Sequence, residues 1–228
     1  MAGLQTIIDN CDSIEIDRRK VVGIQITRNE VARTSETPTF QPWRMKLTMP
    51  SRFRYNQVRS LLEALDTLDR NTPEVVTFGN VPCLSWIFKY QGALTSGQLS
   101  GILVDTFNGN TLRLDNLPSV SSGTVMFEPN DLIQIGNYPY PFTSTTRVLR
   151  GTLGYVDVIT NRPNILTGNV SNETITVGNE CEFNMFCPNM PVYKLKPGGY
   201  MQQGGVTTNN ALIEFSDSFD LYEWVATA

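Results

Sequence analysis

The chain has 228 residues, which is enough for one large or two small domains with a substantial core. It carries 18 Lys and Arg against 22 Asp and Glu, a formal net charge of −4. This balance argues against nucleic acid as the main partner, because sequence-independent binding to phosphates relies on an excess of basic side chains. No stretch approaches the roughly 20 apolar residues of a spanning helix, so we expect no membrane segment.

The first elements along the chain are two short apolar runs on either side of a cluster of cations. Apolar residues alternate with polar ones between Ser13 and Thr27, around Arg18, Arg19 and Lys20. We therefore expect a hairpin over residues 14–27 whose tip carries these three charges. The segment 29–41 is polar and lacks periodicity, which predicts a long loop.

A strand and a helix follow. Trp43, Met45, Leu47 and Met49 alternate with polar residues, which predicts a half-buried strand. Between about residues 51 and 70, apolar residues recur at spacings of three and four, so this segment is predicted to be an amphipathic helix. After it, residues 91–101 are small and polar, which predicts a flexible connection. Hairpin strands at 101–105 and 111–114 then flank Asn108-Gly109, a strong turn signal.

The stretch from Asp131 to Lys196 consists of short β runs separated by turns. Strands are predicted near 132–135, 140–143, 147–149, 155–159, 174–177, 182–186 and 192–195. We expect three pairs of neighbouring runs to meet across turns that contain glycine: 132–135 with 140–143, 147–149 with 155–159, and 174–177 with 182–186. This spacing favours a small sandwich or barrel.

Together these patterns predict a mainly antiparallel β fold with one amphipathic helix, of the α+β class. We expect two portions. Residues 1–90 with 205–228 form one that contains the helix, and residues 91–204 form a β-barrel or sandwich.

The sequence offers no catalytic constellation, and it contains no histidine. Histidine is the commonest general base and metal ligand, so its absence removes the usual nucleophile pairs and metal sites. We predict that the chain is not an enzyme and has no catalytic, cofactor-binding or metal-binding residues. The early acids and the lack of an apolar run argue against a secretory signal, so Cys11, Cys83, Cys181 and Cys187 are expected to be free thiols.

The first quarter of the chain is more basic than the rest. Its cations either form a solvated surface or meet acids of a neighbouring subunit from the C-terminal half, such as Asp217 and Asp220. The second reading gives candidate subunit-interface residues: Arg18, Arg19, Lys20, Arg28, Arg33 and Trp43.

Several runs resemble tail and baseplate proteins of tailed bacteriophages, in particular distal-tail and tube-extension proteins. RRKVVGIQITRN, PWRMKLTMP and FRYNQVRSLLEALDTLDR resemble the hairpin, strand and helix of the tail-tube fold. DLIQIGNYPYPFTSTTRV, GYVDVITNRP and the stretch from NECEFNMF to VYKL resemble a β-barrel module common in such proteins, and IEFSDSFDLYEWV resembles their terminal strand region.

The resemblance implies tail-tube-like sheets plus a barrel module. It further implies a structural protein of the virion tail, made in the host cytoplasm, that assembles with itself into a ring. Rings of this family are usually hexameric, and this one would link the tail tube to the baseplate hub or host-facing tip, in contact with other tail proteins.

An alternative of another class is a binding module that recognises a host carbohydrate or receptor. Tyr138, Tyr140, Phe142 and Tyr200 would stack on sugar rings if they were exposed. In a barrel such side chains more often fill the core.

Overall fold

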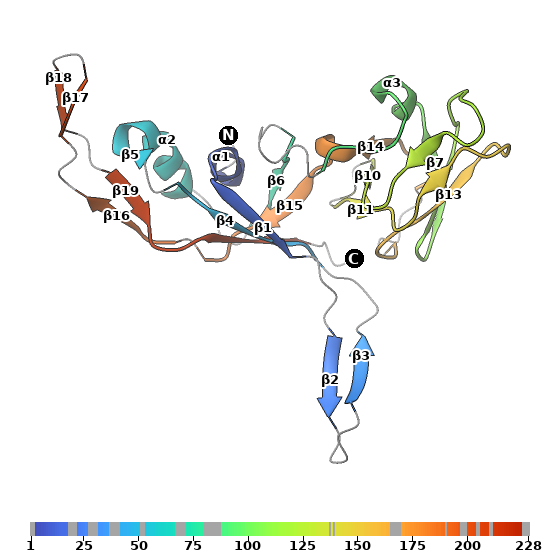
Figure 1. Cartoon of the computed structure of the whole chain (residues 1–228), viewed down its shortest axis with the longest axis horizontal. Helices are drawn as coiled ribbons and strands as arrows, with labels where there is room; N and C mark the ends of the chain where they lie inside the picture. Colours follow the sequence, from blue (N-terminus) through green and yellow to red (C-terminus); the bar gives the residue numbers. More distant parts are fainter. Residues whose placement is uncertain are drawn as a thin grey trace. The chain divides into compact units, whose positions relative to one another are not determined.

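The computed structural model describes residues 3–17, 22–26, 32–36, 42–50, 53–66, 72–79, 88–136, 138, 140–164, 170–189, 191–196, 200–203, 206–209 and 212–224. The described chain is mainly antiparallel β-sheet with few helices (Figure 1). It forms two compact units. Unit 1 contains Met1–Asp17, Trp43–Val76 and Asn184–Trp224, and unit 2 contains Arg18–Pro42, Thr77–Phe183 and Val225–Ala228. The boundaries near 76 and 183 lie earlier in the chain than those expected at 90 and 204.

Unit 1 is built on a five-stranded sheet with the order β1-β4-β20-β15-β6. Its strands are β1 (Ser13–Asp17), β4 (Arg44–Thr48), β6 (Glu74–Val76), β15 (Phe183–Phe186) and β20 (Phe219–Glu223). Alternation in β4 buries Met45 and Leu47 and leaves Arg44, Lys46 and Thr48 exposed, as predicted. β20 lies next to β4, with Leu221 opposite Met45, so the sheet joins two distant parts of the chain.

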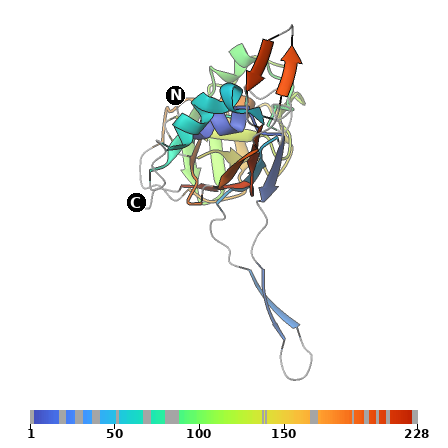
Figure 2. The same cartoon turned by 90° about the vertical axis from the view of Figure 1, so that its left-hand side faces the viewer.

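Two helices belong to unit 1. α2 (Tyr55–Asp66) buries Val58 and Leu62, four residues apart, while Arg59 and Glu63 form an ion pair on its exposed side. α1 (Gly3–Asp9) buries Leu4, Ile7 and Ile8 and contacts both α2 and β6 (Figure 2). The expectation of a single helix is therefore corrected, because the short apolar face of α1 is enough to dock it.

A second sheet of unit 1 has the order β16-β19-β5. Its strands are β16 (Tyr193–Lys196), β19 (Leu212–Phe215) and β5 (Phe53–Arg54). Between β16 and β19 the chain forms a separate two-stranded sheet, β17 (Tyr200–Gln203) with β18 (Val206–Asn209).

Unit 2 packs three small sheets around one core. Their orders are β11-β10-β14, β12-β9 and β13-β8-β7. The strands are β7 (Leu103–Asn108), β8 (Thr111–Asp115), β9 (Val125–Phe127), β10 (Leu132–Ile135), β11 (Phe142–Thr143), β12 (Val148–Leu149), β13 (Val156–Ile159) and β14 (Ile175–Val177). The predicted hairpins β7–β8 and β10–β11 are confirmed, with Gly109 at a φ of 54° in the first turn.

The core of unit 2 combines aliphatic and aromatic side chains from all three sheets. Phe107 and Phe142 pack edge to face with ring centroids 4.8 Å apart, and Tyr140 lies 5.2 Å from Phe142. Arg162 is also buried, with its guanidinium carbon 4.4 Å from the centre of the Tyr140 ring. Tyr140 and Phe142 therefore fill the core, which excludes them from stacking on a sugar.

Several predicted pairings are wrong. β1 pairs with β4, so residues 14–27 do not form a hairpin. β2 (Val22–Ile26) pairs instead with β3 (Ala32–Glu36), which lies within the segment 29–41 that is predicted to be a loop. β12 pairs with β9 and β13 with β8, not with each other. β14 pairs with β10, and a 3-10 helix, η1 (Gly178–Glu180), separates it from β15, which pairs with β20.

Two further expectations also fail. The small polar segment after Gln91, predicted as a flexible connection, contains α3 (Ser96–Leu99), whose first turn is closed by a capping box between Thr95 and Gln98. Of the expected barrel or sandwich, the barrel is not found, because the sheets of the described residues do not close into one.

Candidate assembly surfaces

The predicted interface residues are not brought together by the described part of the structure. Arg18, Arg19, Lys20 and Arg28 lie outside the described residues, and Arg33 is placed only as a backbone position of β3. Trp43 is 2% exposed. Its N–H donates to Glu223 Oε2 and its carbonyl accepts from the Glu223 N–H, both at 2.9 Å. In the single chain Trp43 thus belongs to the core of unit 1.

The most exposed apolar strand of the described chain is β16. Val192, which precedes it, is 72% exposed, and Tyr193 and Leu195 are 36% and 50% exposed. The intervening Lys194 and the final Lys196 are exposed as well. Side chains on both faces of this strand are therefore exposed in the part of the chain that the structure describes.

Among the described strands only β19 is hydrogen-bonded to β16, so β16 is an edge strand there. The Ser216 N–H donates to the Val192 carbonyl at 2.8 Å, and the register places Lys194 opposite Glu214. Hydrogen-bonded pairs alternate along an antiparallel ladder, so Val192 and Lys194 direct their main-chain groups toward β19. The N–H and C=O groups of Tyr193 and Leu195 consequently point to the open edge.

The neighbour of β16 in this ribbon, β19, is anchored in unit 1. Ile213 of β19 is fully buried, and the Tyr193 ring lies 6.2 Å from the ring of Phe215. Lys196 pairs with Glu214, and the hydrogen bond from Lys196 lowers the pKa of that carboxyl group. The exposed edge is thus held on a supported strand.

A second open edge lies in unit 2, along β14. The Gly136 N–H donates to the Thr174 carbonyl at 2.8 Å, and Gln134 pairs with Thr176 in the same register. By the same alternation, Ile175 and Val177 direct their main-chain groups away from β10. β7 covers that edge as far as Thr174: the Val104 N–H donates to the Glu173 carbonyl at 2.9 Å, and Leu103 forms an antiparallel bridge with Thr174.

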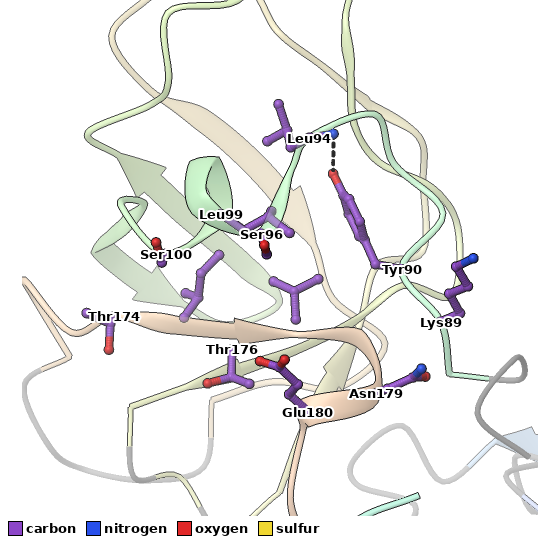
Figure 3. A pocket seen from close by; sticks show the side chains of 12 residues that line it. Lys89, Tyr90, Leu94, Ser96, Leu99, Ser100, Thr174, Thr176, Asn179 and Glu180 are labelled. Atoms are coloured by element: carbon purple, nitrogen blue, oxygen red, sulfur yellow. Dashed lines mark hydrogen bonds between the residues drawn. The ribbon is translucent and has the colours of Figure 1, made fainter. Parts of the chain in front are cut away.

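Where β7 leaves β14, a groove of about 660 Å³ opens beside the strand. Figure 3 shows Ser96 of α3 and the following Ser100 on one side of this groove, and Thr176 of β14 and the preceding Thr174 on the other. Its lining residues are Lys89, Tyr90, Leu94, Ser96, Leu99, Ser100, Thr174, Ile175, Thr176, Val177, Asn179 and Glu180.

Buried polar contacts fix the wall of the groove formed by residues 89–94. The Tyr90 hydroxyl donates to the Met126 carbonyl and accepts from the Leu94 N–H at 3.4 Å (Figure 3). Burial raises the pKa of Tyr90 to about 12, so this phenol remains a donor at neutral pH. Asp131 accepts from the Gln91 N–H and the Glu128 N–H, each at 2.8 Å, and burial raises its pKa.

The described residues hold no group of three or more His, Cys, Asp or Glu side chains placed to bind a metal ion. Cys11, Cys181 and Cys187 are free thiols, and Cys83 lies outside the described residues. Burial raises the pKa of Cys181 well above its ordinary value, which keeps the thiol protonated. In the described part of the chain, no helix has both the length and the apolar character needed to span a membrane.

Comparison with protein-family models finds none that matches this chain, and comparison with curated proteins finds no match either.

Sequence reasoning missed both open edges. VYKLK alternates as a half-buried strand does, and only the tertiary structure shows that its apolar side chains remain exposed among the described residues. The groove depends on the divergence of β7 from β14 at α3, and the capping box between Thr95 and Gln98 is the sequence signal for that helix.

Proposed function

We propose that this chain is a structural virion protein of a phage tail that assembles into a ring, linking the tail tube to the baseplate hub or the host-facing tip. Its partners are further copies of itself, in a ring expected to be hexameric, and other tail proteins. It has no enzymatic activity and no cofactor. The sequence resemblance supplies the tail assignment, and the exposed edge of β16 is the observation that carries the assembly part.

Exposed apolar edges are normally protected in proteins that remain monomeric. Natural sheets shorten or twist their edges, or place charges and prolines on them, because open N–H and C=O groups recruit other strands. β16 has lysines at positions 194 and 196, yet Val192, Tyr193 and Leu195 remain exposed beside an open backbone. Burial of these three side chains in a protein–protein contact removes apolar surface from water and so favours association.

The separate two-stranded sheets also support the proposed assembly. β2–β3 and β17–β18 each pair only within themselves among the described strands. Two-stranded hairpins are marginal in water without a third strand or a packing surface. Contact with a neighbouring subunit or another tail protein would supply that surface.

Light scattering coupled to size exclusion, with negative-stain imaging of the main peak, tests this proposal. We expect rings or stacked rings for the wild-type chain. Leu195→Asp should shift the distribution toward the monomer, because it places a charge in the buried contact. Ile159→Asp is the matched control, since Ile159 is 40% exposed on β13 of unit 2. A strict monomer at every concentration, for the wild-type chain, would contradict the proposal.

Carbohydrate binding is a second candidate, favoured by a hollow of about 370 Å³ lined in part by Arg147, Tyr155 and Asp157. Arg113 forms two hydrogen bonds to Asp157, at 2.8 and 3.1 Å, and its guanidinium carbon lies 4.2 Å from the centre of the Tyr155 ring. An aromatic ring beside a fixed charged pair suits a sugar. Binding on a glycan array that is lost in Tyr155→Ala would support it, and no binding across a broad array would exclude it.

A further inference from the structure

We propose that the open edge of β14 pairs with the open edge of β16 from a second copy of the chain. This rests on the proposed self-assembly and names the two surfaces that meet. The contact extends the β11-β10-β14 sheet of one copy by the β16-β19 ribbon of the next.

The first argument is the spacing of the main-chain groups. On β14, Ile175 and Val177 direct their N–H and C=O groups away from β10, two residues apart, and the open edge begins just beyond the bridge between Leu103 of β7 and Thr174. On β16, Tyr193 and Leu195 present theirs with the same two-residue repeat. An extended strand matches this repeat along its whole length, whereas a helix turns its N–H and C=O groups along its own axis.

The second argument is the shape and chemistry of the groove. Tyr193 and Leu195 lie on one face of β16, because side chains two residues apart share a face of a strand. The groove offers Tyr90, Leu94 and Leu99 beside the β14 edge. An added strand can therefore bury its apolar face against this lining and leave Lys194 and Lys196 on its other face.

The third argument is charge. Exposed Glu173, Glu180 and Glu182 precede or follow β14, and β16 carries Lys194 and Lys196. Lys89 in the groove opposes this attraction, and Lys196 already pairs with Glu214 of its own chain. The balance of three acids against one lysine still favours approach of a basic strand.

The contact is head-to-tail, since the two surfaces are different parts of the same chain. Such contacts produce closed rings when the rotation between copies closes, and filaments when it does not. The pairing thus accounts for a ring without any symmetric dimer interface.

Two variants of the full chain test the pairing. Leu195→Pro removes the N–H that faces the open edge of β16 and leaves the bonds to β19 in place, and proline is tolerated on edge strands. Ser100→Arg places a long cationic side chain at the exposed rim of the groove. Each variant alone should weaken assembly by about tenfold or more, measured as the concentration at which oligomers form in light scattering.

Mixing the two variants gives the decisive measurement. The groove of the Leu195→Pro chain is intact and so is the β16 edge of the Ser100→Arg chain, so the mixture should form 1:1 dimers that neither variant forms alone. The controls are Leu195→Ile, which keeps the main-chain N–H and an apolar side chain, and Ser121→Arg, which changes an exposed serine that does not line the groove. Both should assemble close to the wild-type level.

The outcomes separate this inference from the proposed function. If the wild-type chain assembles and Ser100→Arg assembles equally well, β14 is not the partner surface, although self-assembly stands. Loss of assembly in both variants without dimers in the mixture also overturns the pairing, because it shows that the two edges do not meet each other. A wild-type chain that never assembles contradicts the proposed function and the pairing together.

Discussion

Gly178 sets the end of β14 and the position of the groove wall. Its φ is +77°, and a β-carbon at this position would lie 3.0 Å from the Tyr90 nitrogen and 3.2 Å from the Phe88 oxygen. We expect Gly178→Ala to lower the free energy of unfolding by about 1–3 kcal/mol, since both the backbone conformation and the contact are unfavourable. Urea unfolding measures this change.

Gly97 provides the matched comparison. It lies in α3, without a positive φ, and a β-carbon there would meet no atom within 4 Å. Gly97→Ala should raise the free energy of unfolding by about 0.5–1 kcal/mol through the lower entropy of the unfolded chain. A loss of similar size in both variants would show that the close contact at Gly178 is not the cause.

The buried carboxyl group of Asp131 should make the stability of the fold depend on pH. Both carboxylate oxygens accept main-chain N–H groups, and an amide can replace only one of them, so Asp131→Asn should cost about 1–3 kcal/mol at pH 7. Burial raises the pKa of Asp131 above its ordinary value of 3.8, which means that the folded state binds this proton more tightly than the unfolded state. Ionisation of Asp131 therefore opposes folding above the folded-state pKa, and this effect disappears as the pH falls below 3.8.

The stability difference between the wild-type chain and Asp131→Asn should consequently grow as the pH is lowered from 7 to about 4. Urea unfolding of both proteins across this range measures the difference directly. A gap that narrows on acidification would mean that hydrogen bonds to the carboxylate outweigh its burial.

At the scale of elements, the register of β16 predicts that proline lowers the free energy of unfolding much more at position 194 than at position 195. The Lys194 N–H faces β19, so Lys194→Pro should remove a ladder bond and cost about 1–2 kcal/mol. Leu195→Pro, whose N–H faces the open edge, should cost much less. Circular dichroism during urea unfolding of the dilute monomer distinguishes the two, and equal losses would contradict the assigned register.

The sequence predicts strands better than it predicts their partners. Alternation identified β4, and a glycine turn identified β7–β8, because both signals lie within a few residues. β1 and β2 were recognised as strands but wrongly paired with each other: the actual partner of β1 is β4, about 30 residues away. Side-chain alternation fixes a local backbone conformation, whereas the choice of partner depends on which distant apolar face is available to cover.

The same distinction applies to the candidate surfaces. The sequence contains the exposed residues of β16, but exposure is set by what the rest of the chain leaves uncovered. The interface residues predicted from charge lie mostly outside the described residues. Trp43, which begins the alternating run before Met45, is buried in the core of its own chain.

At the scale of the whole molecule, each unit has a core that one substitution can probe. Leu221 is fully buried in β20, between β4 and β15, and Leu221→Ala should lower the free energy of unfolding of unit 1 by about 2–5 kcal/mol. Hydrogen exchange followed by mass spectrometry should show faster exchange in β4 and β15. Leu112→Ala, in the core of unit 2, should instead speed exchange in β7 and β13. Unchanged exchange in the neighbouring strands would contradict these sheet orders.

The strand order β1-β4-β20-β15-β6 has a consequence for biosynthesis. β20 is central in this sheet, yet it follows β1, β4, β6 and β15 in the sequence, so β1 and β4 must wait for it while the intervening chain is made. Residues 77–183 are continuous and contain the whole core cluster of unit 2, which can therefore consolidate first. The inserted portion of the nascent chain can thus fold before the sequence segments on either side of it pair with each other, and the apolar edge of β16 gains its support only once β19 has been made.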